Sequence, residues 1–151
     1  MPTFDYAFVV DAPLAAVSAF HQSTDILKRL TPPPMIAQIH DFGEMREGMV
    51  ARFTLWLGPI PLRWQARHVD VGPNGFTDVQ ERGPLAVWRH THHFSAESPT
   101  RTRIHEHIEY THRPSLPGLF TRLIFGRIGL HALFTYRQFI TRRTLRRTQP
   151  A

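Results

Sequence analysis

Consecutive strand-like runs joined by short turns fill the middle of this sequence, and they constrain its fold more than any other feature. Each run ends near glycine, proline or another turn-forming residue. The six runs cover residues 35–42, 49–57, 62–71, 76–81, 85–94 and 102–111. Parallel strands need long crossover connections, whereas antiparallel strands can be joined by a tight turn. The spacing therefore predicts an antiparallel sheet.

The segment before these runs predicts a further strand and two short helices. Apolar and smaller or polar residues alternate from Phe4 to Val10, as in a half-buried strand. Asp11 then precedes Ala-Pro, which is a helix-start signal, so we expect a helix over residues 13–20. A second helix should begin at Ser23 or Thr24 and end by Leu30, because three prolines follow Thr31.

The last third of the chain changes from strand to helix periodicity. No proline occurs between Leu116 and Arg147 except at residue 117, and apolar residues recur at helical spacing, which predicts one long helix. Residues 119–134 are apolar around most of the circumference, so we expect deep burial there. Gly126 and Gly129 within it indicate either close packing and a slight bend or room for a ligand beneath the helix.

Together these elements predict an α+β helix-grip architecture. A curved antiparallel sheet of seven strands would wrap around the long C-terminal helix and leave a hollow between them, with the two short helices after the first strand. The length of 151 residues suits one core, and we expect a single domain over residues 1–147 and a tail over 148–151.

Composition narrows the classes of function. The chain has no cysteine, which excludes disulfides and thiol nucleophiles and is consistent with a cytoplasmic location. It lacks a signal-peptide pattern and any apolar run of the ~18 residues that span a bilayer. The net charge is +6, but five arginines lie in the last fifteen residues, and without them 13 basic residues face 12 acidic ones. We therefore expect no nucleic-acid partner; contact of this arginine-rich end with nucleic acid or membrane is the alternative.

Strand alternation places several polar residues on faces that are otherwise apolar. Burial of such groups without partners costs several kcal/mol, so their presence needs an explanation. Either they satisfy one another in a buried network, or they line a hydrated pocket and orient a ligand. We favour the pocket, because the residues come from four strands. They are His68, Asp78, Gln80, His90, His92 and Glu106.

Two further chemistries are open to this group. His90 and His92 are spaced to chelate a metal, but His-x-His alone is weak evidence, and we expect neither a metal nor another cofactor. Glu106 beside a histidine is suited to acid–base catalysis, since burial and pairing shift such pKa values. The sequence contains no nucleophile elbow, phosphate loop or nucleotide fingerprint.

Several short motifs give the chain a resemblance to a known group of proteins. They are Ala12-Pro13, Phe20-His21, Leu30–Pro34, Arg63–His68, Phe76–Pro84, Trp88–Phe94 and Phe134–Arg137. With the element order, they resemble the START-like helix-grip (SRPBCC) superfamily of polyketide cyclases, lipid-transfer domains and pollen allergens, and within it a bacterial branch of small ligand-binding domains. The resemblance implies a cavity for an apolar or aromatic molecule. That branch more often has aspartate at the position of Glu106, so this chain keeps the charge on a longer side chain.

These observations predict a domain that binds a small, largely hydrophobic molecule with polar groups. The polar group defined above would orient the ligand, and the apolar walls would be Trp64, Trp88, Phe94, Ile104, Ile108 and Tyr110. The rival hypothesis is a cyclase, dehydratase or hydrolase of a polyketide-like substrate that uses His90, His92 and Glu106 as acid–base groups. A third is an interaction module that uses the arginine-rich end. The sequence leaves open a homo-oligomer, and it identifies no specific ligand.

Overall fold

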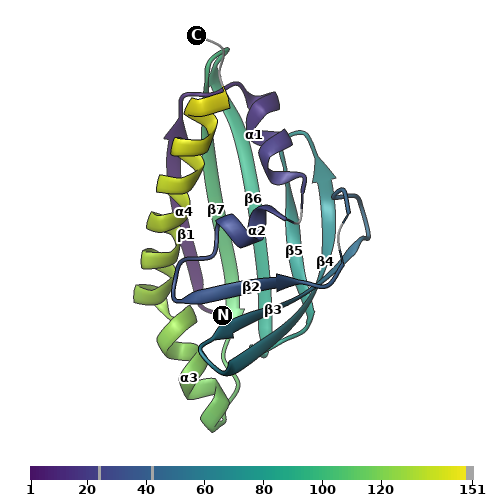
Figure 1. Cartoon of the computed structure of the whole chain (residues 1–151), viewed down its shortest axis with the longest axis vertical. Coiled ribbons are helices and arrows are strands. Elements are labelled where there is room, and N and C mark those ends of the chain that lie inside the picture. The colour runs from purple at the N-terminus through teal and green to yellow at the C-terminus, as the bar shows by residue number, and fades with distance from the viewer. Residues whose placement is uncertain (24, 42, 149–151) are drawn as a thin grey trace.

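The computed structural model describes residues 1–23, 25–41 and 43–148, which form a seven-stranded antiparallel sheet and four helices (Figure 1). The strand order in space is β1-β7-β6-β5-β4-β3-β2. The strands are β1 (Thr3–Val10), β2 (Met35–Ile39), β3 (Val50–Leu57), β4 (Ile60–Gly72), β5 (Gly75–Arg82), β6 (Val87–Ser98) and β7 (Arg101–Thr111). All neighbours pair antiparallel, which confirms the predicted sheet.

The helices lie in the regions where the sequence predicts them, but the C-terminal region forms two helices in place of one. The two short helices after β1 are α1 (Leu14–His21) and α2 (Ile26–Arg29), and the C-terminal helices are α3 (Leu116–Phe125) and α4 (Arg127–Thr148). Thr148 belongs to α4 and not to the expected tail. The described residues do not include residues 24, 42 and 149–151. The expected start of the second helix, the expected end of one strand and the rest of the expected tail fall on these residues.

The prediction of one continuous C-terminal helix is wrong, because the chain breaks at Gly126. Its ψ of 172° is extended and ends α3. A Cβ on Gly129 would lie 2.0 Å from the carbonyl oxygen of Ile124, so the first turn of α4 packs directly against the end of α3. Of the two interpretations of these glycines, the structure therefore supports close packing.

The prediction of deep burial is also wrong for α3 and the start of α4. Leu123 is 77% exposed and Ile128 is 89% exposed, while the opposite side of α3 buries Gly118, Thr121 and Phe125. One helix against one face of a sheet can bury only a stripe of its surface, so an apolar circumference leaves apolar residues outside.

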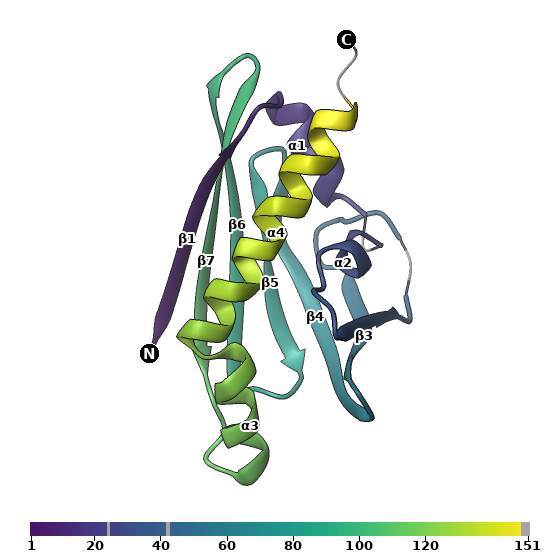
Figure 2. The same ribbon diagram turned by 60° about the vertical axis from the view of Figure 1, so that its left-hand side comes forward.

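The sheet curves around α4, which lies across its concave face, while α3 extends beyond one end (Figure 2). Leu130 and Phe134 of α4 are fully buried there, and the Phe134 ring lies 5.7 Å from that of Phe4 on β1. In β6, Trp88, His90, His92 and Phe94 are buried and alternate with more exposed residues, as predicted. Among the described residues, no helix combines the length and apolar character needed to cross a bilayer.

Candidate functional site

A cavity of about 130 Å³ lies between the concave side of the sheet and the helices. Its walls are mostly apolar. Trp64 and Trp88 meet edge to face with ring centroids 5.4 Å apart, and Phe125 of α3 packs against both. The other apolar lining residues include Leu27, Met35, Phe53, Leu55 and Leu133.

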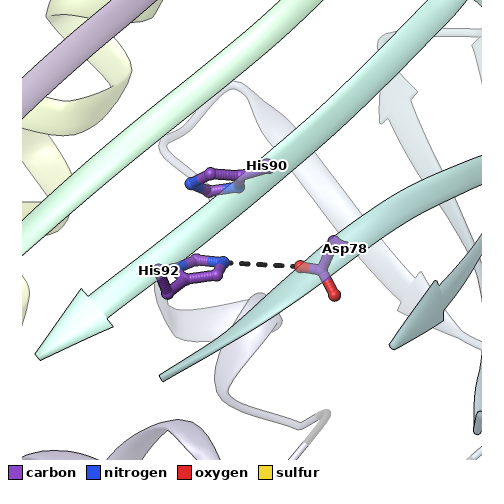
Figure 3. A group of neighbouring side chains, drawn as sticks. All are labelled: Asp78, His90 and His92. Carbon is purple, nitrogen blue, oxygen red and sulfur yellow. Dashed lines mark hydrogen bonds and ion pairs between the residues drawn. The ribbon is translucent and has the colours of Figure 1, made fainter. Parts of the chain in front are cut away.

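One part of the lining is polar and is built by cross-strand pairs. His68 on β4 lies opposite Asp78 on β5, and Asp78 lies opposite His90 on β6. Figure 3 shows His90 and His92 side by side on β6, with Asp78 facing His92 from the neighbouring strand. All four residues line the cavity, because one register of the sheet brings alternate side chains to the same face.

Glu106 on the neighbouring strand β7 contacts this polar group but does not itself line the cavity. It lies opposite His92, and its Oε2 is 2.8 Å from His90 Nε2 and 2.7 Å from His92 Nδ1. The other nitrogen of His92, Nε2, is 3.4 Å from Asp78 Oδ2, and His68 Nδ1 hydrogen-bonds Asp78 Oδ1. His92 thus bridges two carboxylates.

This bridging position fixes the charge of His92. Burial alone lowers its pKa, but the charge of Glu106 and the contacts with both carboxylates raise the pKa to about 9. Burial alone raises the pKa values of the carboxyl groups of Asp78 and Glu106. The contacts with their histidine partners outweigh this effect and hold both pKa values below the usual range. At neutral pH an imidazolium therefore lies between two ionised carboxylates.

His90 and His21, which also line the cavity, have the opposite character. Burial, and then the positive charge of His92, lower the pKa of His90 to about 4, and the same two causes lower the pKa of His21 to about 4. Neutral His90 donates its Nε2–H to Glu106, and His21 donates Nδ1–H to the carbonyl oxygen of Val17 at 2.8 Å. Two histidines on one strand thus differ in protonation state at neutral pH.

Asp78, His90 and His92 are also the residues that could hold a metal ion. Their donor atoms lie within 4.8 Å of one another, and two histidines with one carboxylate suit several divalent metals. Glu106 contacts the second nitrogen of both histidines, in the place where ligating histidines usually have a supporting carboxylate. A metal would have to displace the proton that Glu106 and Asp78 stabilise on His92.

The structure brings half of the predicted site residues to the cavity and half elsewhere. Those that line it are Trp64, His68, Asp78, Trp88, His90 and His92. Those that do not are Gln80, Phe94, Ile104, Glu106, Ile108 and Tyr110. Gln80 donates instead to the carbonyl oxygen of Leu85. The four apolar members lie in the core, where Phe94 and Ile104 pack with Val17 of α1.

Six of the described lining residues come from helices, and none of them was predicted as a site residue. They are His21 of α1, Ile26 and Leu27 of α2, Phe125 of α3, and Leu133 and Arg137 of α4. Strand alternation says nothing about side chains on helices, so that argument could not find them. His21 and Arg137 do lie within two of the short motifs that carry the resemblance, which was the available signal.

Comparison with known proteins supports the fold. No protein-family model matches the sequence, and no curated protein is similar to it. Among solved structures, a protein from Chromobacterium violaceum superposes with a TM-score of 0.75 at 11% identity, over 96% of this chain and 98% of the other.

Two further solved structures with a similar fold belong to named classes of protein. A START superfamily protein from Mycobacterium smegmatis has a TM-score of 0.73 at 8% identity, over 97% of this chain and 99% of the other. An aromatase/cyclase from a Streptomyces species has a TM-score of 0.67 at 16% identity, over 95% of this chain and 90% of the other. The chain therefore has the START-like helix-grip fold.

Proposed function

We propose that this chain binds a small hydrophobic or aromatic molecule with polar groups in the cavity between the sheet and its C-terminal helices. The observation that supports the proposal is the composition of the lining, in which tryptophan, phenylalanine and leucine side chains surround one cluster of buried polar side chains. Apolar walls with a few convergent polar groups are typical of small-molecule sites. An apolar cavity of ~150 Å³ binds benzene in another protein, so about 130 Å³ suits a ligand with one ring.

The first test asks whether the cavity binds a neutral aromatic probe. We expect benzyl alcohol to shift the NMR signals of cavity-lining residues such as Trp64 and Trp88. A Kd of ~1 mM corresponds to about −4.1 kcal/mol, or roughly 0.5 kcal/mol per heavy atom of this probe, which small ligands commonly reach. Native mass spectrometry of the protein as purified would look for a co-purifying ligand.

A matched pair of variants separates cavity binding from general effects on the core. Ala66 lines the cavity and Ala37 does not, although both are buried in the same apolar cluster. Ala66→Leu should fill the cavity and abolish probe binding, whereas Ala37→Leu should retain it. Equal binding by the wild-type chain and Ala66→Leu would contradict the proposal.

The opposed protonation states of His90 and His92 favour a second candidate, an enzyme that uses acid–base catalysis. A histidine with a pKa of about 9 can donate a proton, and one with a pKa of about 4 can accept one. The likeness to an aromatase/cyclase concerns the fold alone. A bell-shaped pH–rate profile for a polyketide-like substrate, abolished in Glu106→Gln, would support catalysis. Ligand binding without turnover would leave the binding proposal in place.

A further inference from the structure

Arg137 is a cation in the cavity lining that makes no ion pair with any carboxylate of the described residues. It is half-buried on α4 and lines the cavity beside the polar group. Its Nε donates to the carbonyl oxygen of Leu30 at 3.2 Å, and its guanidinium carbon lies 5.2 Å from the centre of the Phe134 ring. Within the described part of the chain, its terminal nitrogens have no hydrogen-bond acceptor and no carboxylate partner at ion-pair distance.

The contacts that Arg137 does make hold the side chain in place. The bond to Leu30 uses one edge of the guanidinium, and the ring of Phe134 supports one of its faces. The four N–H groups of the terminal nitrogens remain for another partner. A guanidinium positioned in this way loses little conformational freedom when it binds an anion.

The carboxylates nearest to the cavity are already paired with histidines. Asp78 contacts His68 and His92, and Glu106 contacts His90 and His92. Burial lowers the pKa of Arg137, and the charges of Glu106 and Asp78 oppose that effect from a distance. Arg137 is only half-buried, and its terminal nitrogens are not enclosed by protein, so they remain open to an anionic group that enters the cavity.

We propose that Arg137 anchors the acidic group of the ligand, and that the ligands of this cavity are small aromatic or apolar carboxylic acids. A guanidinium and a carboxylate form two parallel N–H···O bonds, which fixes orientation as well as charge. The apolar body of such an acid would lie against Trp64 and Trp88. This inference rests on the proposed function and narrows its ligand class.

The test compares two probes of nearly equal shape and different charge. Benzoate and benzamide are titrated into the full chain at pH 7 and followed by NMR. We expect benzoate to bind wild-type protein at least about tenfold more tightly than benzamide, because charge-assisted bidentate bonds are about twice as strong as neutral ones. This comparison needs no variant, so it holds whatever the stability of any substitution.

Three substitutions then assign the preference to one side chain. Arg137→Gln should weaken benzoate binding about tenfold or more and leave benzamide nearly unchanged, while Arg137→Lys should retain part of the preference. Arg143→Gln is the control, because Arg143 is exposed on the same helix and does not line the cavity. It removes the same net charge and should change neither affinity.

The outcomes separate this inference from the function on which it rests. Equal binding of the two probes to the wild-type chain, or an unchanged benzoate preference in Arg137→Gln, would overturn the role of Arg137 and leave the binding function standing. Binding of neither benzoate, benzamide nor benzyl alcohol would overturn both. Loss of the benzoate preference in Arg137→Gln alone supports the inference.

Discussion

Glu106 on β7 lies directly opposite His92 on β6, and one of its oxygens, Oε2, is within 2.8 Å of a ring nitrogen of both His92 and His90. A single carboxylate oxygen thus positions both histidines that line the cavity from β6. Any ligand that reaches this polar group meets side chains whose orientation Glu106 sets.

Replacement of Glu106 should therefore be costly. Glu106→Gln leaves the His92 imidazolium with Asp78 alone, and loss of one partner of a buried ion pair typically costs about 3–5 kcal/mol. Urea denaturation at pH 7 would measure the change in the free energy of unfolding. Glu106→Asp keeps the charge but shortens the reach, so an intermediate loss is expected.

Glu109 provides the matched control for that experiment. It lies on the same strand, is half-buried and lies 3.9 Å from Arg89 at a partly exposed position. Surface ion pairs contribute ~0–1 kcal/mol, so Glu109→Gln should change the free energy of unfolding by less than about 1 kcal/mol. Similar losses in Glu106→Gln and Glu109→Gln would contradict the buried pairing described here.

The break between α3 and α4 gives a prediction whose sign is informative. Alanine inside an exposed helix normally stabilises by ~1 kcal/mol relative to glycine. At Gly129 the added Cβ would lie 2.0 Å from a backbone oxygen of α3, so Gly129→Ala should instead destabilise by about 1–3 kcal/mol. Thermal unfolding would show the direction, and a higher melting temperature would mean that the two helices do not pack as closely as described.

The strands could be predicted from the sequence because their signals are local. Turn residues mark where each strand ends, and alternation assigns His68, His90, His92 and Glu106 to the inner face, where the structure buries them. The helix break could not be predicted in this way. Gly126 and Gly129 are compatible with a continuous helix, and only the contact between the end of α3 and the start of α4 decides the matter.

The contribution of the helices to the cavity lining could likewise not be predicted from local sequence signals. Arg137 reaches the lining because α4 crosses the sheet at one particular rotation and height, which tertiary packing determines. The same packing leaves Leu123 outside, although its apolar character predicts burial. Periodicity identifies a helix well, but with an apolar circumference it does not identify which side faces the core.

The two sides of α3 can be compared directly. Leu123 is 77% exposed and Phe125 is 3% exposed on the same helix. Leu123→Gln should change the free energy of unfolding by no more than ~0.5 kcal/mol, whereas Phe125→Ala should cost about 3–5 kcal/mol. Chemical denaturation of both variants would measure the difference. A large loss in Leu123→Gln would indicate that this side chain is buried after all.

The free energy of unfolding should fall as pH rises above 6.5 and should also fall as pH drops below 6.5. The pKa of His92 rises from 6.5 to about 9 on folding, so its stabilisation is complete below pH 6.5 and is lost as pH rises toward 9. The pKa values of His21 and His90 fall from 6.5 to about 4, so both oppose folding as pH drops from 6.5 toward 4. The free energy of unfolding should therefore be highest near pH 6.5.

The two limbs should also differ in steepness. In the alkaline limb the folded chain holds one proton more than the unfolded chain, at His92, which gives a slope of about 1.4 kcal/mol per pH unit. In the acid limb the unfolded chain holds up to two protons more at His21 and His90, and the lowered pKa values of His112, Asp78 and Glu106 add to this difference, so the slope should be at least about twice as large. Urea denaturation at intervals of one pH unit between 4 and 9 would measure both. A His21→Gln variant should lower only the acid slope, since its alkaline limb still depends on His92; an unchanged acid limb in that variant would show that His21 is not held neutral by the fold.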